Sequence, residues 1–503
     1  MADTAEEAQA SQPESLGEKI YELAKRRGFF YPSNEIYGGL TGFYDYGSTG
    51  VLLKRNLENL WRRHFLRFND NSFELEPSEI MPEPVFIASG HIKNFIDPSV
   101  RCKKEGIYYR ADHIISEATG ENVEGKSTGE LERIIAEKKI RCPKCGGELG
   151  EVKVLNMMLQ VRLGAEGDTL AYLRPETAQG VYVDFLRQFN IQRGKLPMGL
   201  AIIGKAFRNE ISPRQLLIRQ REFTQAELQT FIDPNDIENV ERWDDIKDYQ
   251  LHILYSGGDE TQTLRCEDLA LSKKIPKFYV YCMAKMQQFF IDVLGFPQDK
   301  FRLRELSQEE RAFYNKLHFD SEVYLDSLGE YKEVGGIHYR TDHDLNGHAL
   351  ISKKSHEILY NGRRFVPHVV ELTVGIDRVF YSIMELFYNP KSGKREWEWM
   401  AFPRNLSPFQ FAVYPLVNKD GIPESALKVA EKLKRRYEAF YDYSGSIGKR
   451  YARADEIGIP FSITIDYQTL EDGTVTIRDR DTALQSRVKI EDLEGEAERL
   501  LGF

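Results

Sequence analysis

The sequence predicts an α/β (α+β) protein with a large N-terminal region on an antiparallel sheet, interrupted by an insertion, and a smaller C-terminal α/β domain. First, 503 residues are too many for one ordinary core. Second, two β-rich runs, 198–210 and 221–232, are joined by a loop that contains proline and arginine, which favours two antiparallel strands. Third, strands alternate with helices after Pro408, over about a hundred residues, an ordinary domain size.

The N-terminal region begins with a short acidic leader. Residues 1–15 have neither the basic start and apolar stretch of a secretory signal nor the arginines of a transit peptide. We therefore expect a disordered leader on a cytoplasmic protein. Apolar residues at helical spacing then predict one helix from Leu16 and a second that includes Val51 to Phe65. Between them a glycine-rich stretch lacks the ending of a P-loop and is expected to form a loop.

The remaining elements divide the chain at residues 97, 167 and 405. The polar section 97–167, with a charged helix near 131–139, is typical of an insertion within a domain of residues 16–405. A last strand, 368–376, runs directly into an apolar helix. In the C-terminal domain, residues 406–503, we expect strand, helix, helix and strand, and then a hairpin turning at Asp472-Gly473.

Composition excludes several classes of protein. The longest apolar runs are far short of the roughly 20 residues that span a membrane, so no span is predicted. Five cysteines do not form the even framework of a secreted disulfide scaffold, which indicates reduced thiols. The net charge of −10 argues against non-specific nucleic-acid binding. Basic residues gather at 432–436 and 449–453, either as a nucleic-acid-binding face or as solvated helix faces.

Three arginines and an aromatic ring are candidates for a nucleotide site. Arg208 ends one strand of the predicted pair, and Arg219 and Phe223 lie at the start of its partner. Arg378 follows a strand whose Gly375 allows a ligand to approach the backbone closely. Guanidinium groups pair with phosphate oxygens, and a purine can lie between a ring and a guanidinium plane. This set therefore suits a nucleoside triphosphate.

At these residues the chain resembles a known family. FRNEISPRQLLIRQREF (207–223) is similar to motif 2 of class II aminoacyl-tRNA synthetases, VELTVGIDR (370–378) to motif 3, and PSEIMPEP (77–84) loosely to the dimer-forming motif 1. Other segments resemble glycyl-tRNA synthetases in particular: RPETAQG at 174–180, SGHIKNFID at 89–97, YRADH at 109–113 and EVGGIHYRTDHDL at 333–345. The C-terminal IRDRD looks like part of the family's anticodon-binding domain.

The resemblance implies a homodimeric glycine-tRNA ligase with the class II antiparallel-sheet catalytic domain. Its partners would be glycine, ATP and tRNA(Gly), with Mg²⁺ as cofactor and Glu333 and Glu371 as its candidate ligands. Arg208, Glu210 and Arg378 would be catalytic. The expected ATP-binding residues are Arg208, Asn209, Glu210, Ile218, Arg219, Gln220, Arg221, Glu222, Phe223, Glu333, Val334, Gly375, Ile376, Asp377 and Arg378.

Glycine has only an ammonium and a carboxylate, so its site should be small and acidic. By the resemblance the glycine-binding residues are Arg110, Glu176, Phe223, Thr224, Gln225, Ala226, Glu227, Arg340, Glu371, Leu372, Thr373, Val374 and Gly375. The chain departs from the family pattern where Leu372-Thr373 replaces the usual Pro-Ser. Threonine keeps the hydroxyl and adds a methyl group to the pocket floor.

Cys142-Pro-Lys-Cys145 is half of a zinc ribbon. Cys102 is available as a third ligand, and Glu105 or His113 as a fourth. Bound zinc and a decayed knuckle without metal are both compatible with this pattern.

Two other functions remain open at this point. One is a non-catalytic, synthetase-like nucleic-acid-binding accessory protein, against which the retained Arg208, Phe223 and Arg378 argue. The other is a class II synthetase for another small amino acid, such as serine, threonine or proline. The RPETAQG segment and the acidic pocket favour glycine.

Overall fold

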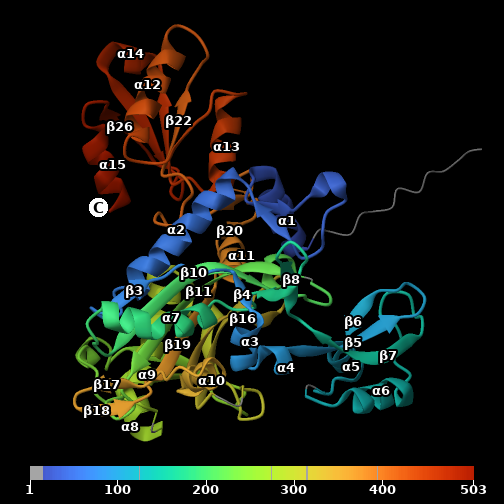
Figure 1. The fold of residues 1–503 in the computed structure, drawn as a ribbon. Coiled ribbons are helices and arrows are strands. Elements are labelled where there is room, and N and C mark those ends of the chain that lie inside the picture. Colours follow the sequence, from blue (N-terminus) through green and yellow to red (C-terminus); the bar gives the residue numbers. More distant parts are fainter. Residues whose placement is uncertain are drawn as a thin grey trace, which may run out of the picture.

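The computed structural model describes residues 15–123, 125–213, 215–273, 275–312, 315–393 and 395–502. Apart from Ser15, the predicted leader lies outside this range. Ser15 caps α1 (Leu16–Arg27), and its hydroxyl and Glu18 complete a capping box. In Figure 1 the C-terminal domain lies above a large central sheet, α1 and α2 (Ser48–Phe65) lie between the two, and an insertion extends to one side.

A nine-stranded sheet forms the centre of the N-terminal region. Its order is β13-β12-β14-β15-β16-β19-β11-β10-β3, antiparallel except for the pairs β12/β14 and β10/β3. The strands are β3 (Ser72–Glu74), β10 (Met198–Phe207), β11 (Glu222–Ile232), β12 (Gln250–Leu254), β13 (Gln262–Arg265), β14 (Phe301–Glu305), β15 (Leu317–Leu325), β16 (Glu330–Thr341) and β19 (His368–Gly375). The predicted pairing of β10 with β11 is confirmed, with Met198 opposite Phe231.

Alternation along the strands divides the sheet into an apolar face and a polar face. In β19, Leu372 and Val374 are buried in the main core with α2, α9 (Lys277–Gln288) and α11 (Ile376–Leu386). Glu371 and Thr373 alternate with them, so their side chains point to the opposite face. The central strands β16, β19 and β11 therefore present a polar surface on a rigid apolar base.

The insertion has its own small core. Strands β5 (Ile96–Cys102), β6 (Tyr108–Arg110) and β7 (Leu149–Asn156) form a three-stranded antiparallel sheet. Helices α5 (Ala111–Thr119) and α6 (Thr128–Glu137) pack against it, and α6 confirms the predicted charged helix. A neighbouring sheet contains β4 (Ile80–Pro82), β9 (Thr169–Leu173) and β8 (Leu159–Leu163).

Shorter elements complete the N-terminal region. The helices are α3 (Glu83–Ala88), α4 (His91–Asn94), α7 (Ala178–Ile191), α8 (Cys266–Lys273) and α10 (His343–Ser352). Three two-stranded ribbons pair β1 (Phe30–Pro32) with β2 (Tyr44–Tyr46), β17 (Ile358–Tyr360) with β18 (Arg363–Phe365), and β20 (Tyr388–Asn389) with β21 (Trp399–Met400).

The C-terminal domain is a five-stranded sheet covered by helices. Its order is β23-β22-β24-β25-β26, with strands β22 (Phe411–Pro415), β23 (Ala439–Tyr441), β24 (Phe461–Ile465), β25 (Thr474–Asp479) and β26 (Gln485–Lys489). The helices are α12 (Ile422–Lys434), α13 (Ile447–Ile457), α14 (Tyr467–Asp472) and α15 (Leu493–Leu501). Apolar clusters lie on both sides of β22, which explains its uninterrupted apolar sequence.

The predicted hairpin at Asp472-Gly473 is wrong. Asp472 ends α14, and Gly473 is its left-handed C-cap with φ of 71°. An Asp-Gly pair can end a helix or form a two-residue hairpin turn, because both structures place a residue with positive φ, usually glycine, at that position. The actual hairpin joins β25 to β26 through residues 480–484.

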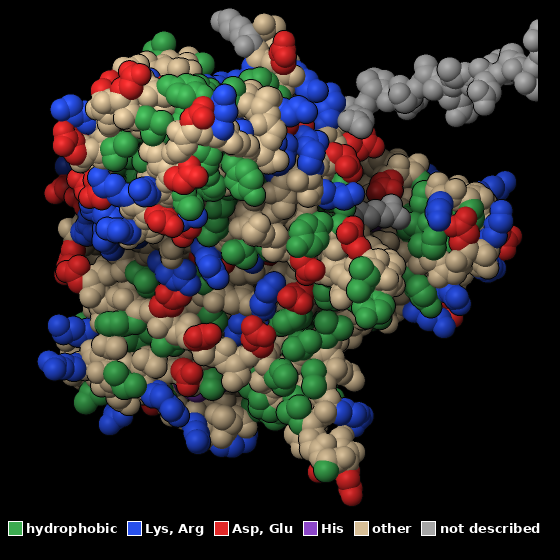
Figure 2. Space-filling model, turned by 90° about the horizontal axis from the view of Figure 1, so that it is seen from above, with side chains coloured by type: hydrophobic (Ala, Val, Ile, Leu, Met, Phe, Trp, Pro, Cys, Tyr) green, Lys and Arg blue, Asp and Glu red, His purple; other side chains and the backbone are tan. Residues whose placement is uncertain are grey.

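The two predicted basic clusters do not form one continuous basic face. Arg450 is buried and donates to the carbonyls of Pro415, Tyr443 and Gly445. Arg453 pairs with Asp442. Figure 2, seen from the side of the C-terminal domain, shows Lys and Arg interspersed with Asp and Glu. Among the described residues, no helix combines the length and apolar character that a membrane crossing requires.

Candidate functional site

A pocket opens on the polar face of the large sheet, beside the loop between β10 and β11. Its empty volume, counted with the space that is open to solvent, is about 590 Å³. It is lined by Arg208, Glu210, Leu217, Ile218, Arg219, Gln220, Phe223, Thr224, Gln225, Glu333, Val334, Gly335, Thr373, Gly375, Asp377 and Arg378. Most of the predicted ATP-binding residues are thus brought together, and Leu217 and Gly335 were missed.

The arginines of this pocket are held by protein groups. Arg208 donates from Nε to the Pro175 carbonyl at 3.1 Å, and its guanidinium lies 5.2 Å from the Phe223 ring centroid. Arg219 pairs with Glu210 at 2.7 Å. Arg378 donates to the carbonyls of Ile218 and Glu333. The three guanidinium groups are therefore oriented before any ligand binds, which lowers the entropy lost on binding.

Four predicted ATP-binding residues do not line the pocket. Arg221 donates to the carbonyls of Thr41 and Glu210, and Glu222 pairs with Lys205 at 3.0 Å. Ile376 is fully buried in the main core. The remaining one, Asn209, hydrogen-bonds through its backbone N–H to Met157.

Asp377 anchors the pocket from below. Its carboxylate accepts hydrogen bonds from the Tyr46 hydroxyl and the Thr224 backbone N–H. Lys54 of α2 lies 3.5 Å from the same carboxylate and donates to the Thr224 hydroxyl at 2.7 Å. Asp377 therefore fixes the start of α11 against β11. Sequence reasoning missed Tyr46 and Lys54, because both lie far from Asp377 along the chain.

The predicted acidic residues converge beside this pocket, where Glu227 lies on β11, Glu371 on β19 and Glu176 just before α7. Glu227 and Glu371 are 2% and 4% exposed, so their charges need partners. Gln229 donates to both, at 3.3 Å and 2.8 Å. Thr373 lies opposite Glu227 in the sheet, and its hydroxyl donates to Glu227 Oε1 at 3.4 Å.

Arg340 holds this acidic group together. It pairs with both oxygens of Asp344 at 2.8 and 2.9 Å, and donates to Glu371 Oε2 at 3.2 Å. Its Nη2 lies 3.8 Å from Glu176. Asp344 and Arg340 are both buried, so Arg340 positions the carboxylates through the protein interior.

The carboxylates differ in pKa because their surroundings differ. Burial and the charges of Glu371 and Glu176 raise the pKa of Glu227 to about 8. Burial also raises the pKa of Glu371, although Arg340 opposes this. Burial acts in the same sense on Glu176, but His91, Arg340 and Gln179 together outweigh it and lower its pKa. One site therefore contains a carboxyl poised near neutrality and another that stays ionised.

Several predicted glycine-binding residues lie elsewhere. Ala226, Leu372 and Val374 pack in the main core on the opposite face, because side chains alternate along a strand. Arg110 belongs to the insertion, where it pairs with Asp97 and Asp112. It lines a second pocket with Arg219, between the insertion and the β10–β11 loop.

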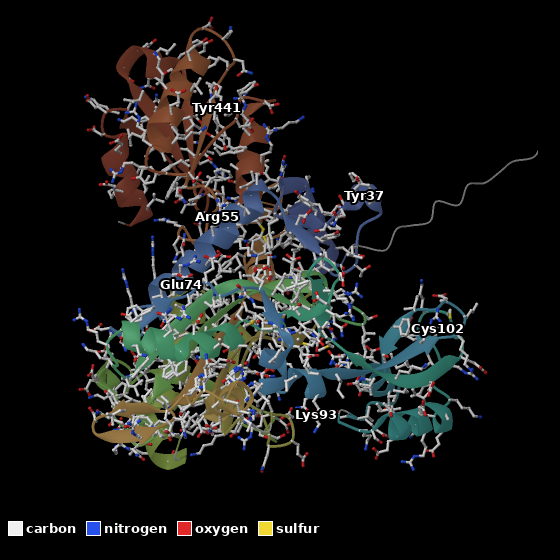
Figure 3. The ribbon with its side chains drawn as sticks, in the orientation of Figure 1. Tyr37, Arg55, Glu74, Lys93, Cys102 and Tyr441 are labelled. Carbon is white, nitrogen blue, oxygen red and sulfur yellow. The ribbon has the colours of Figure 1, made fainter. Side chains whose placement is uncertain are left out.

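Three cysteines form a separate cluster in the insertion. The Sγ atoms of Cys102, Cys142 and Cys145 lie within 4.8 Å of one another, the only such group of metal-ligating side chains among the residues the structure describes. Figure 3 shows Cys102 in the insertion, away from the large sheet. His113 lines the second pocket with Arg110 and is not a member of this cluster.

Comparison with known proteins agrees with this geometry. The family described as tRNA synthetase class II core domain (G, H, P, S and T) matches residues 162–387, and the anticodon binding domain matches 410–500. The glycine–tRNA ligase of Pyrococcus furiosus is 39% identical, covering 96% of this chain and 99% of the relative. That of Aeropyrum pernix is 39% identical and covers 97% of each.

A solved structure is similar in fold. A prolyl-tRNA synthetase from Cryptosporidium parvum, in complex with halofuginone and AMPPNP, has a TM-score of 0.59 at 13% sequence identity. The alignment covers 98% of this chain and 79% of that one. At this identity the likeness supports the class II architecture alone.

Proposed function

The chain belongs to the glycine–tRNA ligase family. From this membership we propose which of its residues bind ATP, glycine, metal and tRNA. It is a class II aminoacyl-tRNA synthetase that activates glycine with ATP and joins it to tRNA. Identity of 39% over nearly the whole length carries this conclusion and leaves no support for a non-catalytic accessory role. Amino-acid-dependent ATP–pyrophosphate exchange across all twenty amino acids tests it, and exchange with another amino acid but not with glycine would overturn it.

ATP occupies the pocket beside the β10–β11 loop. The adenine lies between the Phe223 ring and the Arg378 guanidinium, and Arg208 contacts the α-phosphate. Arg219 would exchange its Glu210 partner for the outer phosphates, after which Glu210 is available to the amino edge of the adenine. The lining of the pocket by all five residues supports this assignment.

Glycine lies over Thr373 with its ammonium among the three glutamates. Three donors converge on Glu371 Oε2, from Tyr182, Gln229 and Arg340, whereas Oε1 has only His338 Nε2 nearby, at 3.5 Å, and is available to the ligand. The glycine carboxylate then points toward the α-phosphate and attacks it, and pyrophosphate leaves. Arg208 stabilises the negative charge that develops on the α-phosphate oxygens.

Mg²⁺ would neutralise the phosphate charge and align the leaving pyrophosphate. Such ions usually take one or two carboxylates together with substrate phosphates. Glu333 fits this role, because it lines the ATP pocket and its side chain is 52% exposed, although it would have to leave its ion pair with Arg378. Glu371 fits it less well, since it is buried and already engaged with Arg340.

The rest of the chain serves the tRNA and the dimer. We assign residues 406–503 to anticodon binding and 16–405 to catalysis, supported by the family matches and by separate apolar cores. We assign the homodimer contact to the segment near β4, where Ile80 and Ile87 are 41% and 45% exposed. Sedimentation at micromolar concentration tests the dimer.

The five cysteines form no disulfide, which fits a cytoplasmic enzyme.

The three cysteines of the insertion bind zinc in this proposal. Their spacing supports it, since Cys102 Sγ lies 3.5 Å from Cys145 Sγ and a zinc ion would bridge such thiolates. No fourth protein ligand belongs to the cluster among the described residues, since the Glu105 carboxylate pairs with Lys144 at 3.3 Å. Metal analysis of protein purified without added zinc should give about one equivalent, lost in Cys142→Ser. Less than about a tenth of an equivalent means a decayed knuckle.

A further inference from the structure

Two histidines continue the row of polar side chains that contains Glu371. His338 of β16 lies opposite Glu371 of β19, and His318 of β15 lies opposite His338. The imidazole centroids are 4.0 Å apart with the rings tilted by 47°.

Both rings lean over Gly336. A Cβ atom at that position would lie 2.6 Å from His338 Nε2 and 3.6 Å from His318 Nε2. Gly336 itself is directly opposite Thr373, the residue under the glycine site. The imidazoles therefore fill the space that a side chain at position 336 would take, and they stand beside the pocket floor.

Hydrogen bonding orients the His338 ring. The Asn315 amide lies 3.4 Å from His338 Nδ1 and can donate to it, which leaves the proton on Nε2. That nitrogen lies 3.5 Å from Glu371 Oε1. The other carboxylate oxygen, Oε2, accepts the hydrogen bonds from Tyr182, Gln229 and Arg340. Burial holds the pKa of His338 well below its usual range, so the ring is neutral.

His318 supports His338 from the far side. Its Nε2 lies 3.0 Å from Asp320 Oδ1, and both side chains are largely buried. Asp320 is the residue opposite Gly336 on β15. The contact is close in distance but lacks hydrogen-bond geometry, so packing against the His338 ring is what places His318. The pair of rings thus lies between Asp320 on one side and Glu371 on the other.

We propose that His338, braced by His318, is a positioning and specificity-determining residue of the amino-acid site. Its ring closes the space over Gly336, so that a substrate with a β-carbon has no room beside Thr373. Its Nε2–H directs Glu371 Oε1 toward the substrate ammonium. This inference rests on the proposed glycine site.

The test compares glycine and alanine in ATP–pyrophosphate exchange for the parent, His338→Ala and His338→Asn. In His338→Ala the alanine-to-glycine ratio of kcat/KM should rise about tenfold or more, the range expected for one methyl group in a tight pocket. The KM for glycine should rise while kcat changes less than about threefold, because the lost contact is to the ammonium. Asparagine keeps a donor near Glu371, so it should restore the glycine KM but not the exclusion of alanine.

His368→Ala is the matched control, since His368 is a half-buried histidine of the same sheet that contacts Tyr339. The His368→Ala variant should leave the alanine-to-glycine ratio of kcat/KM and the KM for glycine within about twofold of the parent values. A parent that does not activate glycine refutes the proposed function. If the parent does and folded His338→Ala keeps the parent's amino-acid ratio and KM, the inference on His338 is overturned. If His338→Ala fails to fold, the same criterion applies to His338→Asn, whose ratio must rise.

Discussion

The glycine dependence of the first step should change with pH through Glu227. This carboxyl is buried on β11, with Glu371 and Glu176 raising its pKa to about 8, and with Thr373, Gln229 and Arg340 as its other polar neighbours. In the absence of glycine it is therefore mostly protonated at pH 7. An ammonium beside it favours the ionised form, so binding of glycine releases that proton.

The magnitude follows from the ionised fraction. With a pKa of about 8, about one site in eleven is ionised at pH 7 and about three in four at pH 8.5. If only the ionised form binds well, the KM for glycine falls about eightfold across this window, equivalent to about 1.2 kcal/mol. The glycine amine stays protonated over the same range, so the substrate itself contributes little to the change.

Protein stability should follow the opposite trend. The folded-state pKa of Glu227 is raised above the ordinary 4.5. Its contribution to the free energy of unfolding is therefore fully present below about pH 4.5 and is lost as the pH rises toward 8. Glycine offsets that loss by pairing with the ionised carboxylate. The increase in melting temperature caused by saturating glycine should therefore be larger at pH 8 than at pH 6.5.

Glycine-dependent exchange measured from pH 6.5 to 8.5, on the parent and on Glu227→Gln, provides the assay. The amide cannot ionise, so the variant should have a raised KM with no slope in this window. A parent KM that is flat with pH would refute the assigned pKa. A slope that survives unchanged in Glu227→Gln would assign the titration to another group.

Three further outcomes are expected. Arg208→Ala should lower glycine-dependent exchange by about 10²-fold or more with an unchanged fold, whereas the surface control Lys205→Ala should not; a loss below tenfold would remove Arg208 from the transition state. Thr373→Gly should raise alanine-dependent relative to glycine-dependent exchange, and an unchanged ratio would show that Thr373 is not part of the wall. A chain ending after Pro408, which keeps the main core through Leu406, should form adenylate but charge tRNA poorly, and equal charging would contradict the assigned division of domains.

Strand periodicity predicted the pairing of β10 with β11 and the strand β19, whereas the family resemblance supplied the class II sheet and most of the residues that line the pocket proposed for ATP. Arg208, Phe223 and Arg378 could be placed together because β10, β11 and β19 are long, apolar on one face and bounded by loops. Contiguous motif runs overstated the glycine site, since alternate residues such as Leu372 and Val374 face the core. A stricter use of the two-residue period would have removed them.

Contacts between distant segments could not be predicted. Tyr46 and Asp377 are 331 residues apart in the chain, and Lys54 and Thr224 are 170 apart. The sequence suggests that Arg450 is a surface charge, but its guanidinium is buried in the C-terminal domain and donates hydrogen bonds to three backbone carbonyls. Such partners depend on how the helices and strands pack together, which no local sequence pattern predicts.

The charge balance of the buried site favours the proposed binding of a cation there. Glu176, Glu371 and Asp344 contact the guanidinium of Arg340, and Glu176 also lies 3.5 Å from His91. Among the described residues Glu227 has no ion pair at this distance, and His338 is kept neutral. Uncompensated buried carboxylates are unfavourable, so the empty site takes up a proton on Glu227 instead. An ammonium supplies the same charge and displaces that proton, whereas a neutral ligand leaves the deficit in place. In the proposed glycine site, charge therefore selects for an ammonium, and the crowded floor of Thr373 and His338 then needs to select by size alone.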